Sequence, residues 1–261
     1  MQDPQEFGVV IVGDEILAGK RTDRHCAHVI ETLGKRGLQL AWARFTSDDR
    51  RRLVRELRQT GEDVVPVFCF GGIGATPDDQ TRQAAAEAFD APLVRNPDAQ
   101  AMIENRFGKD AYPNRILMAD LPEHCALIPN PYNQVPGFSL YDHHFMPGFP
   151  VMAWPMLDWV LDHYYPAAHV QRQEKSLRVM NARESELLQL MQALDERHPD
   201  AVLFSLPHLG EVNTIEIGFR GERGAVATAL ADLTACLEQR ELLFEVCGGA
   251  SDTQGITRPA V

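Results

Sequence analysis

The chain has 261 residues, and a hydrophobic content of 44% is enough for the cores of one large domain and a smaller one. Its net charge of −12, from 25 basic and 37 acidic side chains, opposes binding to nucleic acid phosphates. We find no signal peptide before the first predicted strand, no bilayer-length apolar run and no C-x-x-C pair among five cysteines, so we expect a cytoplasmic protein with reduced thiols and no membrane or nucleic acid partner.

The first ninety residues alternate between the patterns of buried strands and amphipathic helices. Strands are predicted at 7–12, 38–45 and 64–70, and helices at 24–36, 50–59 and 82–89. Asp23 is suited to cap the first of these helices, and Gly37 is suited to end it. This order predicts a parallel sheet with right-handed crossovers, in which ligands bind beyond the carboxyl ends of the strands.

The next segment predicts a return to the same sheet. A helix is predicted at 98–107, and short apolar segments broken by proline and glycine follow at 126–131, 135–140 and 144–150. We interpret these short segments as a hairpin that adds strands to the sheet. Asp142, His143 and His144 are expected on a surface loop, and a helix rich in methionine and aromatic residues is predicted at 150–164.

The pattern changes after Tyr165 and Pro166. Strands are predicted at 176–180, 201–206, 212–219 and 242–246, and helices at 184–196 and 224–240. The order β-α-β-β-α-β is that of the ferredoxin-like unit. The fold class is therefore α/β, with a three-layer parallel-sheet domain at 1–166, a small α+β domain at 167–247 and a flexible tail at 248–261.

The most informative stretch lies between the strand at 64–70 and the helix at 82–89, and it reads CFGGIGATPDDQT from Cys69 to Thr81. A strand, a glycine turn and a helix N-terminus bring backbone N–H groups to one point, which favours an anion and usually a phosphate. Asp78 and Asp79 beside that point favour a divalent cation or a carboxylate directed at phosphorus. The alternative is a simple turn in which Asp79 or Thr81 only caps the helix.

Two other pieces are expected at the same edge of the sheet. Gly13, Asp14 and Glu15 follow the first strand, and Asp48 follows the second. Because the carboxyl ends of parallel strands meet at one edge, these acidic groups are predicted to converge on the glycine loop. On such an acidic protein, a phosphorylated ligand must be held by backbone amides, a helix dipole or a metal ion.

The glycine stretch resembles the G-G-x-G-P-T-x-D-D-x-T signature of the molybdopterin-binding fold, most closely in the competence/damage-inducible protein A (CinA) family. The resemblance spans about residues 7–246 and includes further pieces in the family's order. These are Gly13–Leu17 (G-D-E-L-L), Ser47-Asp48 (V-G-D), Asn130-Pro131 with Pro136–Phe138 (N-P…A-P-G-F), Pro147–Pro150 (P-G-V-P) and Glu184–Leu187 (E-S-E-L).

This resemblance implies a chemistry. In related molybdopterin adenylyltransferases, the aspartates matching Asp48 and Asp79 serve adenylyl transfer with magnesium. In the CinA family, the same domain is associated with metal-dependent hydrolysis of the ADP-ribose pyrophosphate. Longer members add a nicotinamide-nucleotide amidase domain; this chain ends before it, so the amidase reaction is not expected. The family also implies a homo-oligomer, with a dimer as the expected form.

The expected site follows from the matched motifs. Asp79, Asp48 and Asp78 are the candidate catalytic residues, and Asp79 and Asp48 are the candidate ligands of Mg²⁺ or another divalent cation. The ligand is a phosphorylated small molecule, a nucleotide or a pterin such as molybdopterin. Its candidate contacts are Gly71, Gly72, Gly74, Thr76, Thr81, Gly13, Asp14, Glu15, Asn130, Gly137, Pro147 and Gly148.

Several positions depart from the family pattern. Ala75 replaces the loop proline, Met152 stands where many relatives have glutamate, and Asn133-Gln134 replace Gly-Thr. His25 stands where asparagine is common, and its spacing from His28 suits zinc, although no further ligand is evident. Three functions remain open: an enzyme acting on a nucleotide pyrophosphate, a binding module without turnover, and a structural or regulatory oligomer.

Overall fold

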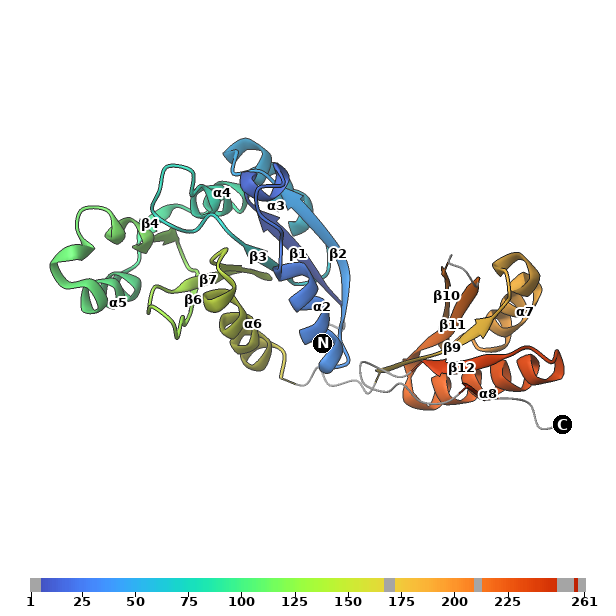
Figure 1. Cartoon of the computed structure of the whole chain (residues 1–261). Coiled ribbons are helices and arrows are strands. Elements are labelled where there is room, and N and C mark those ends of the chain that lie inside the picture. The colour runs from blue at the N-terminus through green and yellow to red at the C-terminus, as the bar shows by residue number, and fades with distance from the viewer. Residues whose placement is uncertain (1–5, 167–171, 209–212, 248–255, 258–261) are drawn as a thin grey trace. The chain divides into compact units, whose positions relative to one another are not determined.

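The computed structural model describes residues 6–166, 172–208, 213–247 and 256–257. The chain divides into two compact units, residues 1–169 and 170–261 (Figure 1). The first unit has an α/β fold and the second has an antiparallel sheet with helices, so the predicted fold class is confirmed. No helix in the described ranges has the length and apolar character that crossing a membrane requires.

The first unit is built on a six-stranded sheet with the strand order β2-β1-β3-β8-β7-β6. Strands β2, β1, β3 and β8 are parallel, whereas β7 runs antiparallel to both of its neighbours. The predicted hairpin is confirmed as β7 and β8. The strands are β1 (Glu6–Val12), β2 (Gln39–Thr46), β3 (Val67–Phe70), β6 (Ala126–Ile128), β7 (Gly137–Leu140) and β8 (His143–Met146).

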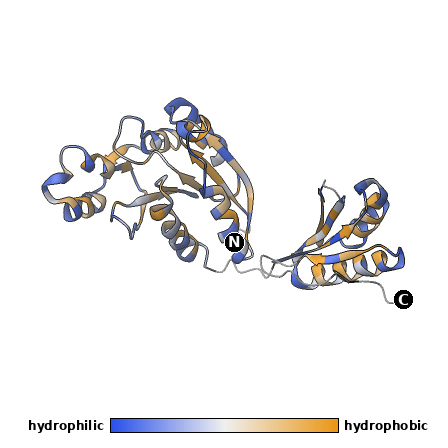
Figure 2. Cartoon of the chain, viewed as in Figure 1, coloured by the Kyte–Doolittle hydropathy of each residue, from blue (hydrophilic) through white to orange (hydrophobic). Residues whose placement is uncertain are grey.

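Helices cover both faces of this sheet, which gives the three predicted layers (Figure 1). Hydrophobic residues of α3, α4 and α5 pack on one face, and those of α2 and α6 pack on the other. Figure 2 shows the central strands between them in the hydrophobic colour. The helices are α1 (Asp14–Leu17), α2 (His25–Lys35), α3 (Arg50–Gly61), α4 (Thr81–Ala88), α5 (Pro97–Phe107) and α6 (Pro150–Tyr164), with 3₁₀ turns η1 (Gly108–Ala111) and η2 (Arg115–Ala119).

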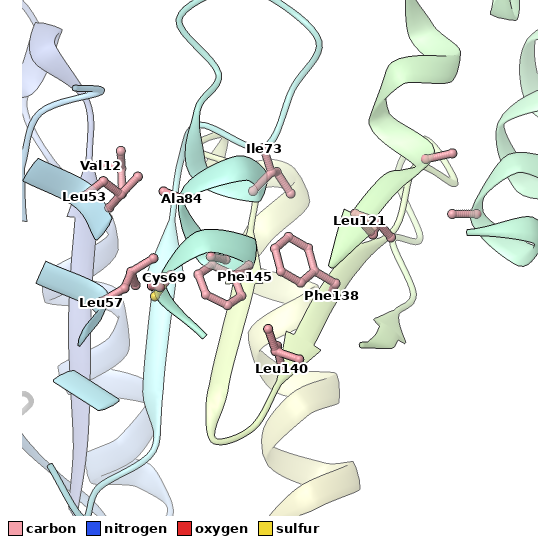
Figure 3. Close-up of a cluster of buried hydrophobic side chains, with 14 of the residues drawn as sticks. Val12, Leu53, Leu57, Cys69, Ile73, Ala84, Leu121, Phe138, Leu140 and Phe145 are labelled. Carbon is pink, nitrogen blue, oxygen red and sulfur yellow. The ribbon is translucent and has the colours of Figure 1, made fainter. Parts of the chain in front are cut away.

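The core explains why the strands lie where they do. After Glu6, every residue of β1 is buried, as expected for a strand covered on both faces. Figure 3 shows the α3–α4 side of the core, where Phe138 and Phe145 stack with ring centroids 4.5 Å apart. Asp23 precedes Arg24, the N-cap residue of α2, and its carboxylate accepts hydrogen bonds from the backbone N–H groups of His25 and Cys26 at 2.9 and 3.0 Å, so it satisfies the start of the helix as expected.

Two sequence expectations in this unit were wrong, and one pair of strands was missed. The strand at 64–70 starts only at Val67, because Val64 is 99% exposed and gains nothing from the sheet. A two-stranded sheet of β4 (Leu93–Arg95) and β5 (Asp120–Pro122) was not anticipated, since three-residue strands have too short a pattern to read. His143 and His144 lie in β8, not on a surface loop, and are 3% and 1% exposed.

The second unit has the predicted order β-α-β-β-α-β. Its strands follow the order β10-β11-β9-β12-β13 with antiparallel neighbours, and α7 and α8 contribute to one hydrophobic core. Residue 212 of the predicted third strand lies outside the described residues. Of the predicted tail at 248–261, the structure describes only residues 256–257, which form β13. The elements are β9 (Arg172–Met180), α7 (Glu184–Arg197), β10 (Ala201–His208), β11 (Thr214–Glu222), α8 (Arg223–Gln239), β12 (Phe244–Cys247) and β13 (Ile256–Thr257).

The buried histidines predict that the first unit loses stability in acid. Burial lowers the pKa of His143 to about 4 and that of His144 to about 3. In the unfolded chain both groups protonate near pH 6.5, so lowering the pH from about 6.5 to about 4 favours unfolding. We expect a loss on the order of 2 kcal/mol per histidine at pH 4.5.

Urea unfolding followed by tryptophan fluorescence measures this loss, because Trp42, Trp154 and Trp159 all lie in the first unit. The variant His143→Gln keeps a hydrogen-bonding group beside Thr60 but does not titrate, so its stability should depend less on pH than that of the wild type. A wild-type free energy of unfolding that is constant between pH 7 and pH 4.5 would contradict the expectation.

Candidate active site

The carboxyl ends of the four parallel strands open onto a cavity of about 470 Å³. Each strand contributes the residues that directly follow it, and these carry the predicted motifs. Of the candidate residues, Asp48, Asp78, Asp79, Gly71, Gly72, Gly74, Thr76, Gly13, Glu15, Asn130, Pro147 and Gly148 line this cavity. The parallel order therefore brings together pieces of sequence that lie more than a hundred residues apart.

The carbonyl groups of the glycine loop are held by the first two residues of α4. Thr81 donates from Oγ1 to the Gly71 carbonyl and from its backbone N–H to the Gly72 carbonyl, both at 2.9 Å. Arg82 donates from Nη2 to the Gly74 carbonyl at 2.7 Å. Three carbonyls of the loop are thus turned toward α4.

This arrangement also sets the direction of the loop's amides. In a trans peptide the C=O and N–H groups point to opposite sides, so the N–H groups of Gly72, Ile73 and Ala75 point away from α4. All three residues line the cavity, and none of these N–H groups donates to another group within the described residues. Outward amides beside a helix N-terminus are suited to bind an anion.

Each of the three glycines meets a separate steric demand. Gly71 has φ of +110°, and a Cβ there would lie 2.3 Å from the Val12 carbonyl oxygen. Gly72 has φ of +67°, and its Cβ would lie 2.3 Å from the Thr81 hydroxyl. At Gly74 a Cβ would lie 2.4 Å from Asp79 Oδ2, so this glycine makes room for a carboxylate over the loop.

Asp79 does not cap α4. Its Oδ2 accepts hydrogen bonds from the backbone N–H of Thr76, at 2.9 Å, and from the Thr76 hydroxyl. The N-cap position belongs to Gln80, whose side chain makes no capping hydrogen bond. The carboxylate of Asp79 is instead held across the turn of the glycine loop, at the wall of the cavity.

Asp48 is placed among other acidic groups. Its Oδ2 accepts a hydrogen bond from the backbone N–H of Asp14 at 2.8 Å. Burial raises the pKa of Asp48 above its ordinary value, the Asp14 N–H opposes this, and the charges of Asp14, Glu15 and Asp78 raise it further. A cation beside Asp48 would relieve this repulsion.

These carboxylates do not form a complete protein-only metal site. Within the described ranges, no group of three or more His, Cys, Asp or Glu side chains converges to hold a metal ion. Magnesium, however, commonly uses one or two carboxylates and completes its shell with water and the phosphates of a substrate. The donor set at Asp48 and Asp79 fits that mode of binding.

Three candidate residues, Thr81, Asp14 and Gly137, are not among the residues that line the cavity, and each has a structural role beside it. Thr81 is buried beneath the glycine loop and holds its carbonyls. Asp14 supplies the backbone N–H that binds Asp48. Gly137 lies where a Cβ would be 2.4 Å from the Phe145 carbonyl oxygen, so its role is to let β7 approach β8.

Sequence reasoning missed the part that His25 plays. His25 donates from Nε2 to the Gly148 carbonyl at 3.1 Å and stacks on Phe70 with ring centroids 4.5 Å apart. Burial lowers its pKa, and the Gly148 carbonyl opposes this. A Cβ added at Gly148 would lie 3.4 Å from the Cα of Gly71, so the two loops approach closely here and His25 fixes one of them.

His28, whose spacing from His25 suits zinc, is engaged elsewhere. It stacks on Trp154 with ring centroids 3.9 Å apart and is hydrogen-bonded to Thr32 at 3.3 Å. Since His25 binds Gly148, the two rings serve different contacts in this structure.

One buried polar atom also points to a ligand. Asn130 lines the cavity and is only 5% exposed. Its Oδ1 accepts a hydrogen bond from the backbone N–H of Tyr132 at 3.0 Å, whereas its Nδ2 has no partner within the described residues. Buried polar groups are normally paired, so the unpaired amide of this cavity-lining residue is a candidate donor to a bound molecule.

Comparison with known proteins places the first unit in a family. The family described as "Probable molybdopterin binding domain" matches residues 8–167. A CinA-like protein of Geobacter sp. strain M21 is 32% identical over 192 residues, which cover 69% of this chain and 46% of the relative. A CinA-like protein of Geobacter metallireducens is 28% identical over 256 residues, which cover 93% of this chain and 61% of the relative.

A solved structure agrees with these matches. The crystal structure of the protein CinA, of unknown function, from Thermoplasma acidophilum has a TM-score of 0.56 and 29% identity, and the match covers 60% of this chain and 96% of that one. The chain spans about half the length of the curated relatives it matches.

The geometry predicts that Gly74→Ala weakens anion binding without a general loss of stability. Gly74 does not have a positive φ, so alanine is allowed there, but its Cβ would displace the Asp79 carboxylate. We expect about a tenfold rise in the Kd for inorganic pyrophosphate with Mg²⁺, measured by calorimetry. Gly34→Ala is the control, because a Cβ at Gly34 meets nothing within 4 Å. Equal affinity in the two variants would show that the Gly74–Asp79 packing does not matter for binding.

Proposed function

Because the chain belongs to the family of probable molybdopterin-binding domains and is CinA-like, we propose that its cavity binds a phosphorylated nucleotide or pterin. We further propose that it promotes hydrolysis or transfer at a pyrophosphate of that ligand. Binding of a pterin-type small molecule is the coarser role that the family itself supports. The reaction at a pyrophosphate, with ADP-ribose as the first candidate substrate, is our proposal.

One observation carries this proposal: three outward amides and two acidic loops face the same cavity. The N–H groups of Gly72, Ile73 and Ala75 are suited to hold phosphate oxygens, because their partner carbonyls are bound by α4. Asp48 and Asp79 lie on that cavity too, where like charges would repel a phosphate. Amides for the anion and carboxylates for a cation support a metal–phosphate complex as the ligand.

The proposed roles follow from these positions. Asp48 and Asp79 would hold Mg²⁺ or another divalent cation together with the phosphate. When bound, the cation supplies positive charge that neutralises the phosphate oxygens as phosphorus is attacked. The amides orient the phosphate, Thr76 fixes the Asp79 carboxylate, and His25 holds the neighbouring loop in place. The unpaired amide of Asn130 is a candidate donor to the rest of the ligand.

A second function is favoured by one departure at the cavity wall. Met152 lines the cavity where many relatives have glutamate, and the Asn133 side-chain amide donates to its sulfur at 3.6 Å. A thioether provides neither a charge nor a base. This wall supports a non-catalytic module that binds a nucleotide or pterin phosphate without turnover.

A thermal-shift screen identifies the ligand class. ADP-ribose, ATP, AMP, FAD and molybdopterin are tested with and without Mg²⁺. A ligand at about a hundred times its Kd adds about 2.7 kcal/mol, which raises Tm by about 5 °C in a domain of this size. We expect pyrophosphate-containing compounds to give the largest shifts, and only with Mg²⁺. Shifts that do not depend on Mg²⁺ would contradict the proposed role of the carboxylates.

Replacing Asp79 separates the two functions. Asp79→Asn keeps the shape of the side chain but removes the charge, so hydrolysis of ADP-ribose with Mg²⁺ or Mn²⁺ should fall roughly a hundredfold, about 3 kcal/mol of transition-state stabilisation. Asp78→Asn, at the adjacent position, should cost less. Rates are compared at matched folding stability. If wild type and Asp79→Asn hydrolyse ADP-ribose equally, or if the wild type hydrolyses no pyrophosphate, the enzymatic function is contradicted. The second function, binding without turnover, is then the one supported.

We also propose that the chain self-associates, with a dimer as the expected form. The family resemblance supports this, and so do Val202 and Leu206, which are exposed on β10 at the edge of the second sheet. Light scattering at micromolar concentrations should give a mass of about twice 29.2 kDa. A single species at the monomer mass over that range would contradict self-association.

A further inference from the structure

Arg82 has an unusual place in the first unit. It is the second residue of α4, directly after the glycine loop, and it is only 3% exposed. Burial of a guanidinium is costly unless its donors are satisfied. Within the described residues Arg82 forms no direct ion pair. Backbone carbonyls satisfy its two terminal nitrogens, whereas its buried Nε has no partner in the described part of the chain.

These carbonyls come from two separate segments. Nη2 donates to the Gly74 carbonyl in the glycine loop at 2.7 Å. Nη1 donates to the Asp120 carbonyl at 2.9 Å and also to the Leu117 carbonyl. One planar side chain therefore connects the glycine loop to residues 115–120, which form η2 and begin β5.

The second segment also belongs to the cavity, because Met118 lies between the two carbonyl-bearing residues and lines the cavity wall. On the other side of Arg82, the Gly74 carbonyl belongs to the Gly74–Ala75 peptide. The N–H of that peptide, on Ala75, faces the cavity. A movement of either segment relative to the other would change the shape of the site. The fixed fork of a guanidinium resists such movement better than the flexible point charge of lysine.

We propose that Arg82 is a positioning residue that joins the glycine loop to residues 115–120, so that the outward amides and the Met118 wall form one preorganised site. Its charge also lies under the loop, where it favours an anion bound on the other side. This role goes beyond the proposed function: the ordering of the two segments does not depend on which ligand binds, whereas the effect on phosphate affinity does.

The test compares Arg82→Met and Arg82→Lys with Arg58→Met. Arg58 is a matched control, because it is exposed on α3 and donates to the Glu87 carbonyl of the same helix α4, away from the loop. Three quantities are measured for each protein: the free energy of unfolding, the ¹⁵N order parameters of the amides, and the Kd for inorganic pyrophosphate with Mg²⁺.

We expect the amides of Gly74, Ala75 and Met118 to have order parameters of about 0.85 in the wild type and in Arg58→Met, and below about 0.6 in Arg82→Met. The Kd for pyrophosphate should rise about tenfold or more in Arg82→Met, because the loop amides are no longer held in place. Arg82→Lys retains the positive charge but not the planar guanidinium. We therefore expect a smaller decrease in the order parameters and a smaller rise in the Kd than in Arg82→Met.

A folded Arg82→Met with wild-type order parameters in both segments would overturn the proposal. If Arg82→Met does not fold, Arg82→Lys decides: unchanged order parameters at Gly74 and Met118 overturn the proposal, and a selective decrease supports it. Failure of the wild type to bind pyrophosphate would count against the proposed function alone, since the order parameters still measure whether Arg82 joins the two segments.

Discussion

The site depends on the orientation of three peptide groups. A backbone amide can bind a ligand only if its hydrogen is not used within the fold, and a loop rarely leaves several amides free at one point. Here Thr81 and Arg82, the first two residues of α4, bind the carbonyls of Gly71, Gly72 and Gly74. The opposite sides of those peptides are thereby directed to the cavity, and the glycines are the residues that permit this backbone path.

Electrostatics then limits what such a site accepts. The chain carries a net charge of −12, and Asp48, Asp78, Asp79 and Glu15 line the same cavity as the amides. Arg21 also lines it, at 3.8 Å from Glu15, and the buried Arg82 lies beneath the loop. A free polyanion would meet repulsion at the mouth of this cavity, whereas a phosphate with a divalent cation brings the charge that the carboxylates favour.

Sequence patterns predicted what local residues determine. The apolar runs of β1 and β3, the helix signals and the glycine motif gave the order of elements and the sheet edge, and twelve of the candidate residues line the cavity. Contacts over long sequence distances were not predictable. Arg82 reaches Leu117 and Asp120, and His25 reaches Gly148, through single side-chain hydrogen bonds that leave no periodic pattern. In the sequence, His143 and His144 resemble part of a polar turn. Both are buried in the folded chain, and the local sequence does not indicate this burial.

The most direct measurement is a titration of the ¹⁵N-labelled protein with inorganic pyrophosphate, with and without Mg²⁺, followed by amide chemical shifts. If the loop holds phosphate as described, the largest downfield shifts with Mg²⁺ present occur at the N–H groups of Gly72, Ile73 and Ala75, while Gly71, whose N–H donates to the Met146 carbonyl at 3.0 Å, shifts little. Saturable binding that leaves those three amides unchanged would contradict the account, because the phosphate would then be held elsewhere.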